Sequence, residues 1–196
     1  MKDIKIISEL PDETIGYHLK QARRNLARSG IRLTDFHGAE VWLTDSAEIN
    51  YLCLIKDTVI LFLIRLVKRR ELADGQQIML IPNAPREFVP LVQRFSMFAL
   101  FKMLLPKYHI LLQDKEQPAS GAKMYRGLVA NGMGSHCIAY IYDTRVTPGK
   151  WIYLSYSRSV QDLNLGLYGP RVGNEKLLLA ISDKKILKDK PATEAL

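Results

Sequence analysis

Two kinds of apolar pattern alternate along the chain and predict a single α/β domain. Apolar residues recur every three or four positions over about 12–29 and 86–105, which predicts two amphipathic helices. Shorter apolar runs between polar turns predict strands at residues 40–44, 50–55, 58–67, 76–81, 108–112, 138–143, 151–156 and 176–181. The strands at 50–55 and 58–67 are joined by a short turn and therefore predict an antiparallel hairpin.

The segment 108–143 is the most informative part of this pattern. A strand at 108–112, a short helix opened by Pro118–Gly121 and a second strand at 138–143 predict a parallel strand–helix–strand crossover. We therefore expect a mixed, mostly antiparallel sheet that contains this crossover. Ligands of open α/β sheets bind beyond the carboxyl ends of the strands, where Asp114 and Asp143 would lie.

No internal repeat or composition change divides the chain. We expect one domain over residues 1–183 and a basic, flexible tail over 184–196. The longest apolar run, Thr58–Val67, is interrupted by Arg65 and is far shorter than the roughly 20 residues of a membrane span. The first ten residues lack the apolar core of a signal peptide, so a cytosolic protein without a membrane span is expected.

The net charge of +8 permits contact with nucleic acid, an acidic membrane surface or a phosphorylated cofactor. It equally permits a basic surface that only aids solubility. The consecutive cations Lys68, Arg69 and Arg70 form a candidate surface for nucleic acid or a protein partner. The cations of the first helix are interpreted more simply as a solvated face, with nucleic-acid contact as the alternative. No recognised DNA- or RNA-binding signature is present.

The histidines and cysteines do not have the spacing of a metal site. Cys53 and Cys137 are far apart in apolar segments and are interpreted as buried free thiols. The serines lack the flanking glycines of a nucleophile elbow, which disfavours a hydrolase of that kind.

The order of elements resembles the acyl-CoA N-acyltransferase (GNAT-like) fold over roughly residues 15–143. More narrowly, residues 112–125 look like a segment of acyltransferase-like proteins carried by bacteriophages and mobile elements. Their pattern is matched by Asp114, Gly121, Tyr125, Tyr142 and Asp143. Gln113 stands where that pattern usually has Ser, and Tyr125 where it usually has Trp.

The resemblance implies a site for acetyl-CoA or another acyl-CoA, without a metal. Asn83, Arg86, Gly121 and Tyr125 would bind the cofactor. For transfer of the acyl group to an amine, Asp114 would be the base and Tyr142 the acid; alternatively, Asp114 caps a helix and Tyr142 packs on the sheet.

The loop that should hold the pyrophosphate departs from the family pattern. Residues 82–86 contain no glycine, and two of them are prolines, which lack a backbone N–H donor. The sequence therefore leaves open whether the chain is an active transferase. The alternatives are an inactive GNAT-like protein of the virion, a protein that binds a phage or host partner in the host cytosol, and a basic nucleic-acid-binding module.

Overall fold

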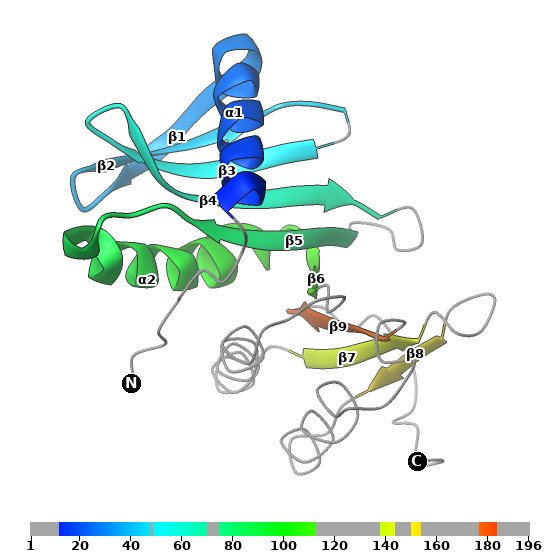
Figure 1. Cartoon of the computed structure of the whole chain (residues 1–196). Coiled ribbons are helices and arrows are strands. Elements are labelled where there is room, and N and C mark those ends of the chain that lie inside the picture. The colour runs from blue at the N-terminus through cyan, green and yellow to red at the C-terminus, as the bar shows by residue number, and fades with distance from the viewer. Residues whose placement is uncertain are drawn as a thin grey trace.

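The computed structural model describes residues 12–47, 49–69, 75–112, 138–143, 150–153 and 177–183 (Figure 1). These residues form a mixed α/β structure around one nine-stranded sheet, with strand order β1-β2-β3-β4-β5-β6-β9-β7-β8. The strands are β1 (Gly30–Phe36), β2 (Ala39–Thr44), β3 (Ile49–Lys56), β4 (Val59–Lys68), β5 (Gly75–Pro82), β6 (His109–Leu112), β7 (Ile138–Asp143), β8 (Lys150–Tyr153) and β9 (Leu177–Ser182). Seven of the eight ladders between them are antiparallel, and β5–β6 is parallel.

Two helices accompany the described part of the sheet. Helix α1 (Asp12–Ser29) precedes β1 and carries acids in its first turn and Arg28 in its last, which suits the helix dipole. Between β5 and β6, a 3₁₀ turn η1 (Arg86–Phe88) leads into α2 (Val89–Phe98) and a π-helical segment η2 (Ala99–Leu104). The long helix expected over 86–105 is therefore present, with three successive helical geometries.

Alternation of side chains along the strands gives each helix its own face of the sheet. Leu52, Phe62 and Ile64 belong to the cluster that contains Phe95 of α2. Tyr51, Cys53, Leu63 and Ile81 belong to the cluster that contains Ala22 of α1. The two faces are called the α2 face and the α1 face below.

The strands of the expected crossover, β6 and β7, are not neighbours in the sheet. Strands β6 and β7, the expected crossover pair, run in the same direction, but β9 lies between them and pairs antiparallel with both. β9, the last of the described strands, is thus inserted in the sheet, where its apolar run LLLAI is flanked on both sides. The expected helix at 118–130 and the tail at 184–196 lie outside the described residues.

Strand β1 was not predicted from the sequence. Most of its residues are exposed, so neither face of the strand is buried in the core and gives it a clear apolar pattern. α1 ends at Ser29, where the sequence predicted its end, and Gly30 follows directly. A Cβ there would lie 2.5 Å from the carbonyl oxygen of Leu26, a contact that only glycine avoids. His37 and Gly38 then form the two-residue turn to β2 with positive φ angles of 48° and 77°.

Candidate functional site

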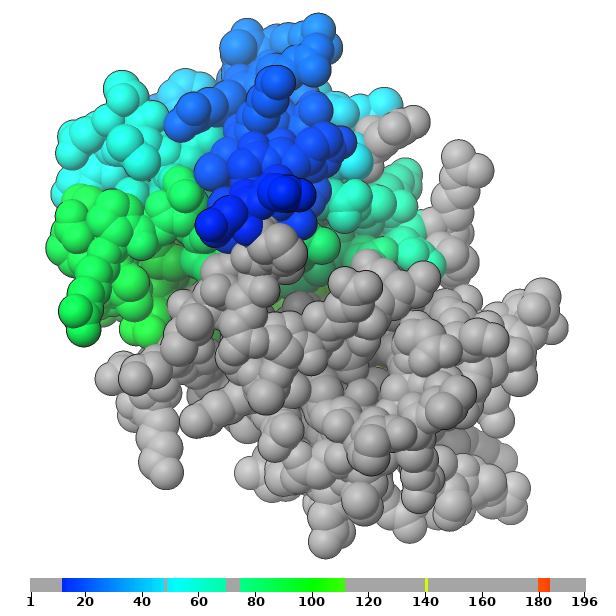
Figure 2. Space-filling model, in the orientation of Figure 1, coloured from blue at the N-terminus to red at the C-terminus, as the bar shows by residue number. Residues whose placement is uncertain are grey.

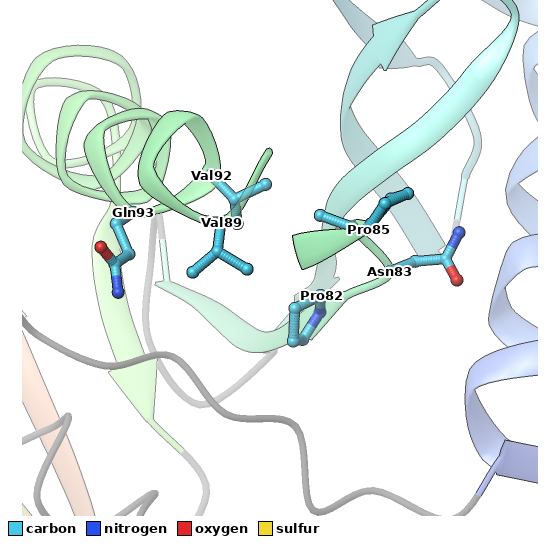
Figure 3. Close-up of a pocket in the computed structure, with 7 residues that line it drawn as sticks. Pro82, Asn83, Pro85, Val89, Val92 and Gln93 are labelled. Carbon is cyan, nitrogen blue, oxygen red and sulfur yellow. The ribbon is translucent and has the colours of Figure 1, made fainter. Parts of the chain in front are cut away.

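A pocket of about 410 Å³ lies where β5 gives way to the long helix (Figure 3). Its apolar lining comes from the loop and from the first turns of α2, and it also contains two carboxamides. The lining residues are Pro82, Asn83, Ala84, Pro85, Val89, Val92 and Gln93. This is the segment in which the sequence predicted the cofactor-binding residues Asn83 and Arg86.

Among the described residues, β6 accompanies only the first half of β5. The register pairs Gly75 with His109 and Ile78 with Leu112, and the described part of β6 ends there. β5 continues to Pro82, which is four residues, or about 13 Å, further along the strand direction. The pocket thus lies at the carboxyl end of a parallel strand, next to the beginning of a helix, where α/β proteins commonly bind ligands.

Asn83 fastens the loop to the sheet. Its side-chain nitrogen Nδ2 donates to the carbonyl oxygen of Ile60 at 2.8 Å, and its backbone N–H donates to the carbonyl of Leu61 at 2.9 Å. The side chain points away from α2 (Figure 3). Asn83 therefore positions the loop, and its amide N–H₂ group already has a protein acceptor.

Few backbone donors are offered at the helix start. The N–H groups of Phe88 and Val89 donate to the carbonyls of Pro85 and Arg86 within η1. Pro82, Pro85 and Pro90 have no N–H group. Among the described residues, the N–H groups of Ala84, Arg86 and Glu87 donate to no backbone carbonyl. At most three donors are therefore available to an anion here.

The local charge does not compensate for the missing donors. Arg86 is exposed, and its positive charge is followed directly by the exposed carboxylate of Glu87. Lys56 lies over the ring of Phe88, with its Nζ 5.4 Å from the ring centroid. The pocket itself contains no charged side chain, and is better suited to a neutral group than to a phosphate.

The other residues predicted for an acyl-CoA site are only partly within the structure. Tyr142 lies in β7, where its backbone pairs with Trp151 and Leu178; its side chain is outside the described part. Asp114, Gly121 and Tyr125 lie outside the described residues. Strands β5, β6 and β7 run in one direction, and the register through β6 and β9 places Tyr142 level with Met79, three residues before Pro82. Three strand spacings, about 14 Å, separate β7 from β5.

The predicted basic surface at the hairpin end is reduced by an internal contact. Lys68 is exposed at the end of β4, whereas Arg69 donates from a guanidinium nitrogen to the side-chain oxygen of Gln77 at 2.9 Å. Arg70 lies outside the described residues. Arg69 thus ties β4 to β5 and is not a purely solvated cation.

The α1 face contains a polar cluster that the sequence did not reveal. His18 of α1 is buried, and its Nδ1 lies 3.2 Å from the hydroxyl oxygen of Tyr51 on β3. Arg65 of β4 is the cross-strand partner of Tyr51, and its buried Nε has no hydrogen-bond partner among the described residues. Burial, assisted by the charge of Arg65, lowers the pKa of His18. Burial raises the pKa of Tyr51.

A second histidine contact joins β6 to the last strand. Nδ1 of His109 lies 2.6 Å from Oγ of Ser182, although the two residues are 73 positions apart. Ser182 is completely buried, so its hydroxyl holds the strands together and is not presented to a substrate. Only the pairing of β6 with β9 creates this contact, and no local motif signals it.

The thiol of Cys53 is also internal. Cys53 is buried and is not in a disulfide, and burial raises its pKa to about 12. The interpretation of Cys53 as a buried free thiol is confirmed, whereas Cys137 lies outside the described residues. Within the described ranges, no group of three or more His, Cys, Asp or Glu side chains is arranged to hold a metal ion. No helix in this part of the chain combines the length and apolar character that crossing a membrane requires.

Comparison with known proteins gives no family assignment: no family model matches the chain, and neither a curated protein nor a solved structure is significantly similar to it. The geometry described above is therefore the basis for a functional proposal.

Proposed function

We propose that this chain is an acyltransferase-fold protein, of the GNAT-like type carried by phages and mobile elements, that binds an acyl-CoA or its pantetheine arm beside α2. The observation that carries the proposal is the pocket at the carboxyl end of β5, beside the start of the long helix. The order strand, loop, long helix and parallel strand around that pocket supports a GNAT-like interpretation of the fold.

The chemistry of the lining supports the pantetheine arm as the group bound in the pocket. That arm is a neutral chain with two amide groups. The pocket offers apolar contacts from Val89, Val92 and Pro82 and an amide from Gln93. With at most three free N–H donors and Arg86 next to Glu87, the diphosphate of CoA would be held weakly.

Transfer of an acyl group to an amine is the reaction that this proposal includes. The amine must lose a proton, and the thiolate of CoA must gain one. Asp114 remains the proposed base and Tyr142 the proposed acid. Asp114 follows β6 in the sequence, Tyr142 lies near the end of β7, and both strands run in the same direction as β5.

Calorimetric titration of the full chain with acetyl-CoA and with CoA tests the binding step. We expect a dissociation constant in the micromolar range, equivalent to about −8 kcal/mol. Val89→Trp fills the pocket and should abolish the heat of binding. Val59→Trp is the matched control, because Val59 is a 42% exposed valine at the hairpin turn between β3 and β4. Absence of binding by the unmodified chain, or equal loss in both variants, would overturn the proposal.

Replacement of the loop proline sharpens the test. Pro85→Ala adds one backbone N–H donor at the helix start, where φ of Pro85 is −52° and suits alanine. We expect CoA to bind several-fold more tightly, about 1 kcal/mol for one added hydrogen bond, whereas pantetheine, which has no diphosphate, should gain nothing and can only lose contacts of the proline ring. A gain for both ligands would show that the proline does not limit a phosphate contact.

The scarcity of donors at the helix start favours one alternative, an inactive GNAT-like protein that binds a phage or host protein. For this alternative, the chain would bind pantetheine or CoA without any transfer to amines. Asp114→Ala separates the two: loss of transfer with unchanged CoA affinity supports a catalytic base, whereas loss of folding supports a helix cap.

A further inference from the structure

The outer face of α1 is strongly basic. Every cation of the helix is exposed, and the helix lies open at the surface of the molecule (Figure 2). Its exposed cations are Lys20, Arg23, Arg24 and Arg28. The only acids of the helix, Asp12 and Glu13, are confined to its first turn.

These four cations are not accounted for by ion pairs. Among the described residues, none of them lies within 4.0 Å of a carboxylate, whereas Arg32 on the neighbouring strand pairs with Asp35 at 2.7 Å. The helix dipole accounts for Arg28, which lies in the last turn, but its effect fades beyond that turn. Lys20, Arg23 and Arg24 therefore have no evident structural role.

The spacing of the cations suits a polyanion with regular charges. Lys20, Arg24 and Arg28 follow one another at four-residue intervals, so they form a row about 12 Å long on one side of the helix. One strand of a nucleic acid presents a phosphate about every 3.4 Å along its axis, so this row spans three or four phosphates.

An exposed aromatic ring extends the row. Tyr17 is 59% exposed, lies three residues before Lys20, and rests edge-on against the ring of His18 with centroids 5.2 Å apart. Aromatic rings beside basic side chains are platforms for nucleic-acid bases. An acidic protein surface would match the charges but not this ring.

We propose that the outer face of α1 is a nucleic-acid-binding surface, in which Lys20, Arg24 and Arg28 contact backbone phosphates and Tyr17 stacks on an unpaired base. This surface is separate from the pocket at α2, because the two helices cover opposite faces of the sheet. It also differs from the hairpin end at Lys68–Arg70, where Arg69 already contacts Gln77.

Fluorescence anisotropy of the full chain with labelled single-stranded RNA and duplex DNA of about 20 units tests this surface at salt concentrations from about 50 to 200 mM. The test variant replaces Lys20, Arg24 and Arg28 by Gln. The control variant replaces Arg94, Lys102 and Lys107 by Gln; these three cations are exposed on the α2 side and carry the same total charge. Circular dichroism and urea midpoints confirm that both variants fold.

We expect the α1 variant to bind at least about tenfold more weakly and its logarithmic salt slope to fall by about 2.7, or 0.9 for each lost phosphate contact on a duplex. The control should keep the slope of the unmodified chain. A variant with Arg24→Lys and Arg28→Lys, which keeps the charge, should also keep the slope. Tyr17→Ala should weaken RNA binding more than duplex binding.

Three results would overturn the inference. The first is no binding to either nucleic acid at the lowest salt concentration. The second is an equal loss in the α1 variant and the control, which would assign binding to net charge. The third is binding to vesicles that contain phosphatidylserine without binding to nucleic acid, which would assign the surface to a membrane. None of these results depends on whether the pocket binds CoA.

Discussion

The two faces of the sheet differ in what their helices bury. The α2 face is mainly apolar, with Phe95 packed edge-on near Phe62 and Phe36 at centroid distances of 6.1 and 5.4 Å, and its buried Ser96 donates within the helix to the carbonyl of Gln93. The α1 face buries an apolar cluster around Ala22, but it also encloses the contact of His18 with Tyr51 beside Arg65. The fully buried residues of the α2 face include no titratable group, whereas the α1 face combines packing with titratable groups.

This difference has a consequence for stability. Apolar packing depends little on pH, whereas a buried histidine must lose its proton to stay buried. Attachment of α1 should therefore respond to acid, and attachment of α2 should not. The two helices also differ outside the core. The pocket beside α2 has no charged side chain in its lining, whereas the outer surface of α1 is basic.

The largest expected effect is on the α2 face. Phe95 is completely buried, and Phe95→Ala should lower the free energy of unfolding by about 3–5 kcal/mol through lost contacts and the resulting cavity. Urea denaturation measures this loss. The pH dependence of stability should match that of the unmodified chain, and a changed pH dependence would contradict the proposed division between the faces.

The next effect concerns the loop that joins the two faces. Asn83 leads into the helix of the α2 face, and its amide donates to Ile60, whose side chain belongs to the α1 cluster. Asn83→Ala should lower stability by about 1–3 kcal/mol, because the carbonyl of Ile60 loses its donor. Gln93→Ala is the control, since Gln93 is a carboxamide of the same pocket, and should cost less in a urea titration.

A smaller effect is expected at His18. Its pKa is lowered in the folded chain by burial and then by Arg65, while the unfolded value is near 6.5. The unfolded chain therefore binds the proton more readily, so the stability linked to His18 is present above pH 6.5 and is lost as the pH falls below it. The loss stops once the pH is below the lowered folded pKa.

His18→Gln tests this linkage, because glutamine is polar but does not titrate. Urea midpoints from pH 7.5 down to pH 5, a range set by the ordinary histidine pKa of about 6.5, should fall less in the variant. Tyr17, Tyr51 and Arg65 lie beside His18, and burial raises the pKa of Tyr51, which keeps that hydroxyl neutral in this range. An unchanged pH profile would show that other groups control the acid response.

The smallest effect concerns Cys53, which is completely buried in the apolar cluster of the α1 face. Because burial raises its pKa to about 12, almost no thiolate forms at neutral pH. In a Cys137→Ser background, a thiol reagent should modify Cys53 only after denaturation. Rapid modification of the folded chain would mean that α1 separates from the sheet more readily than its packing indicates.

The sequence predicted the elements that have a clear apolar period. The hairpin of β3 and β4 and strand β5 were correct because burial on both faces gives apolar runs, and the long helix from Arg86 was correct because its buried side gives a helical period. Strand β1 has no such side and was missed. The position of β9 between β6 and β7 depends on long-range pairing, which the local pattern of neither strand contains.

The candidate site was predictable in location but not in chemistry. A strand that runs into a helix after a turn indicated the loop at 82–86, and the pocket lies there. The anchoring role of Asn83 depends on the carbonyl of Ile60, 23 residues away in the chain. The contacts of His18 with Tyr51 and of His109 with Ser182 were missed for the same reason.

Strand β1 also bears on self-association of the chain, because it forms an edge of the sheet. It is an end strand of the sheet, and it exposes Ile31 and Leu33 at 52% and 42%. An exposed sheet edge can recruit strands from other molecules and so start polymerisation. A register shift between Arg32 and Thr34 interrupts the edge, and Arg32 is paired with both Asp35 and Glu40. We expect this irregular, charged edge to hinder edge-to-edge pairing with strands of other molecules.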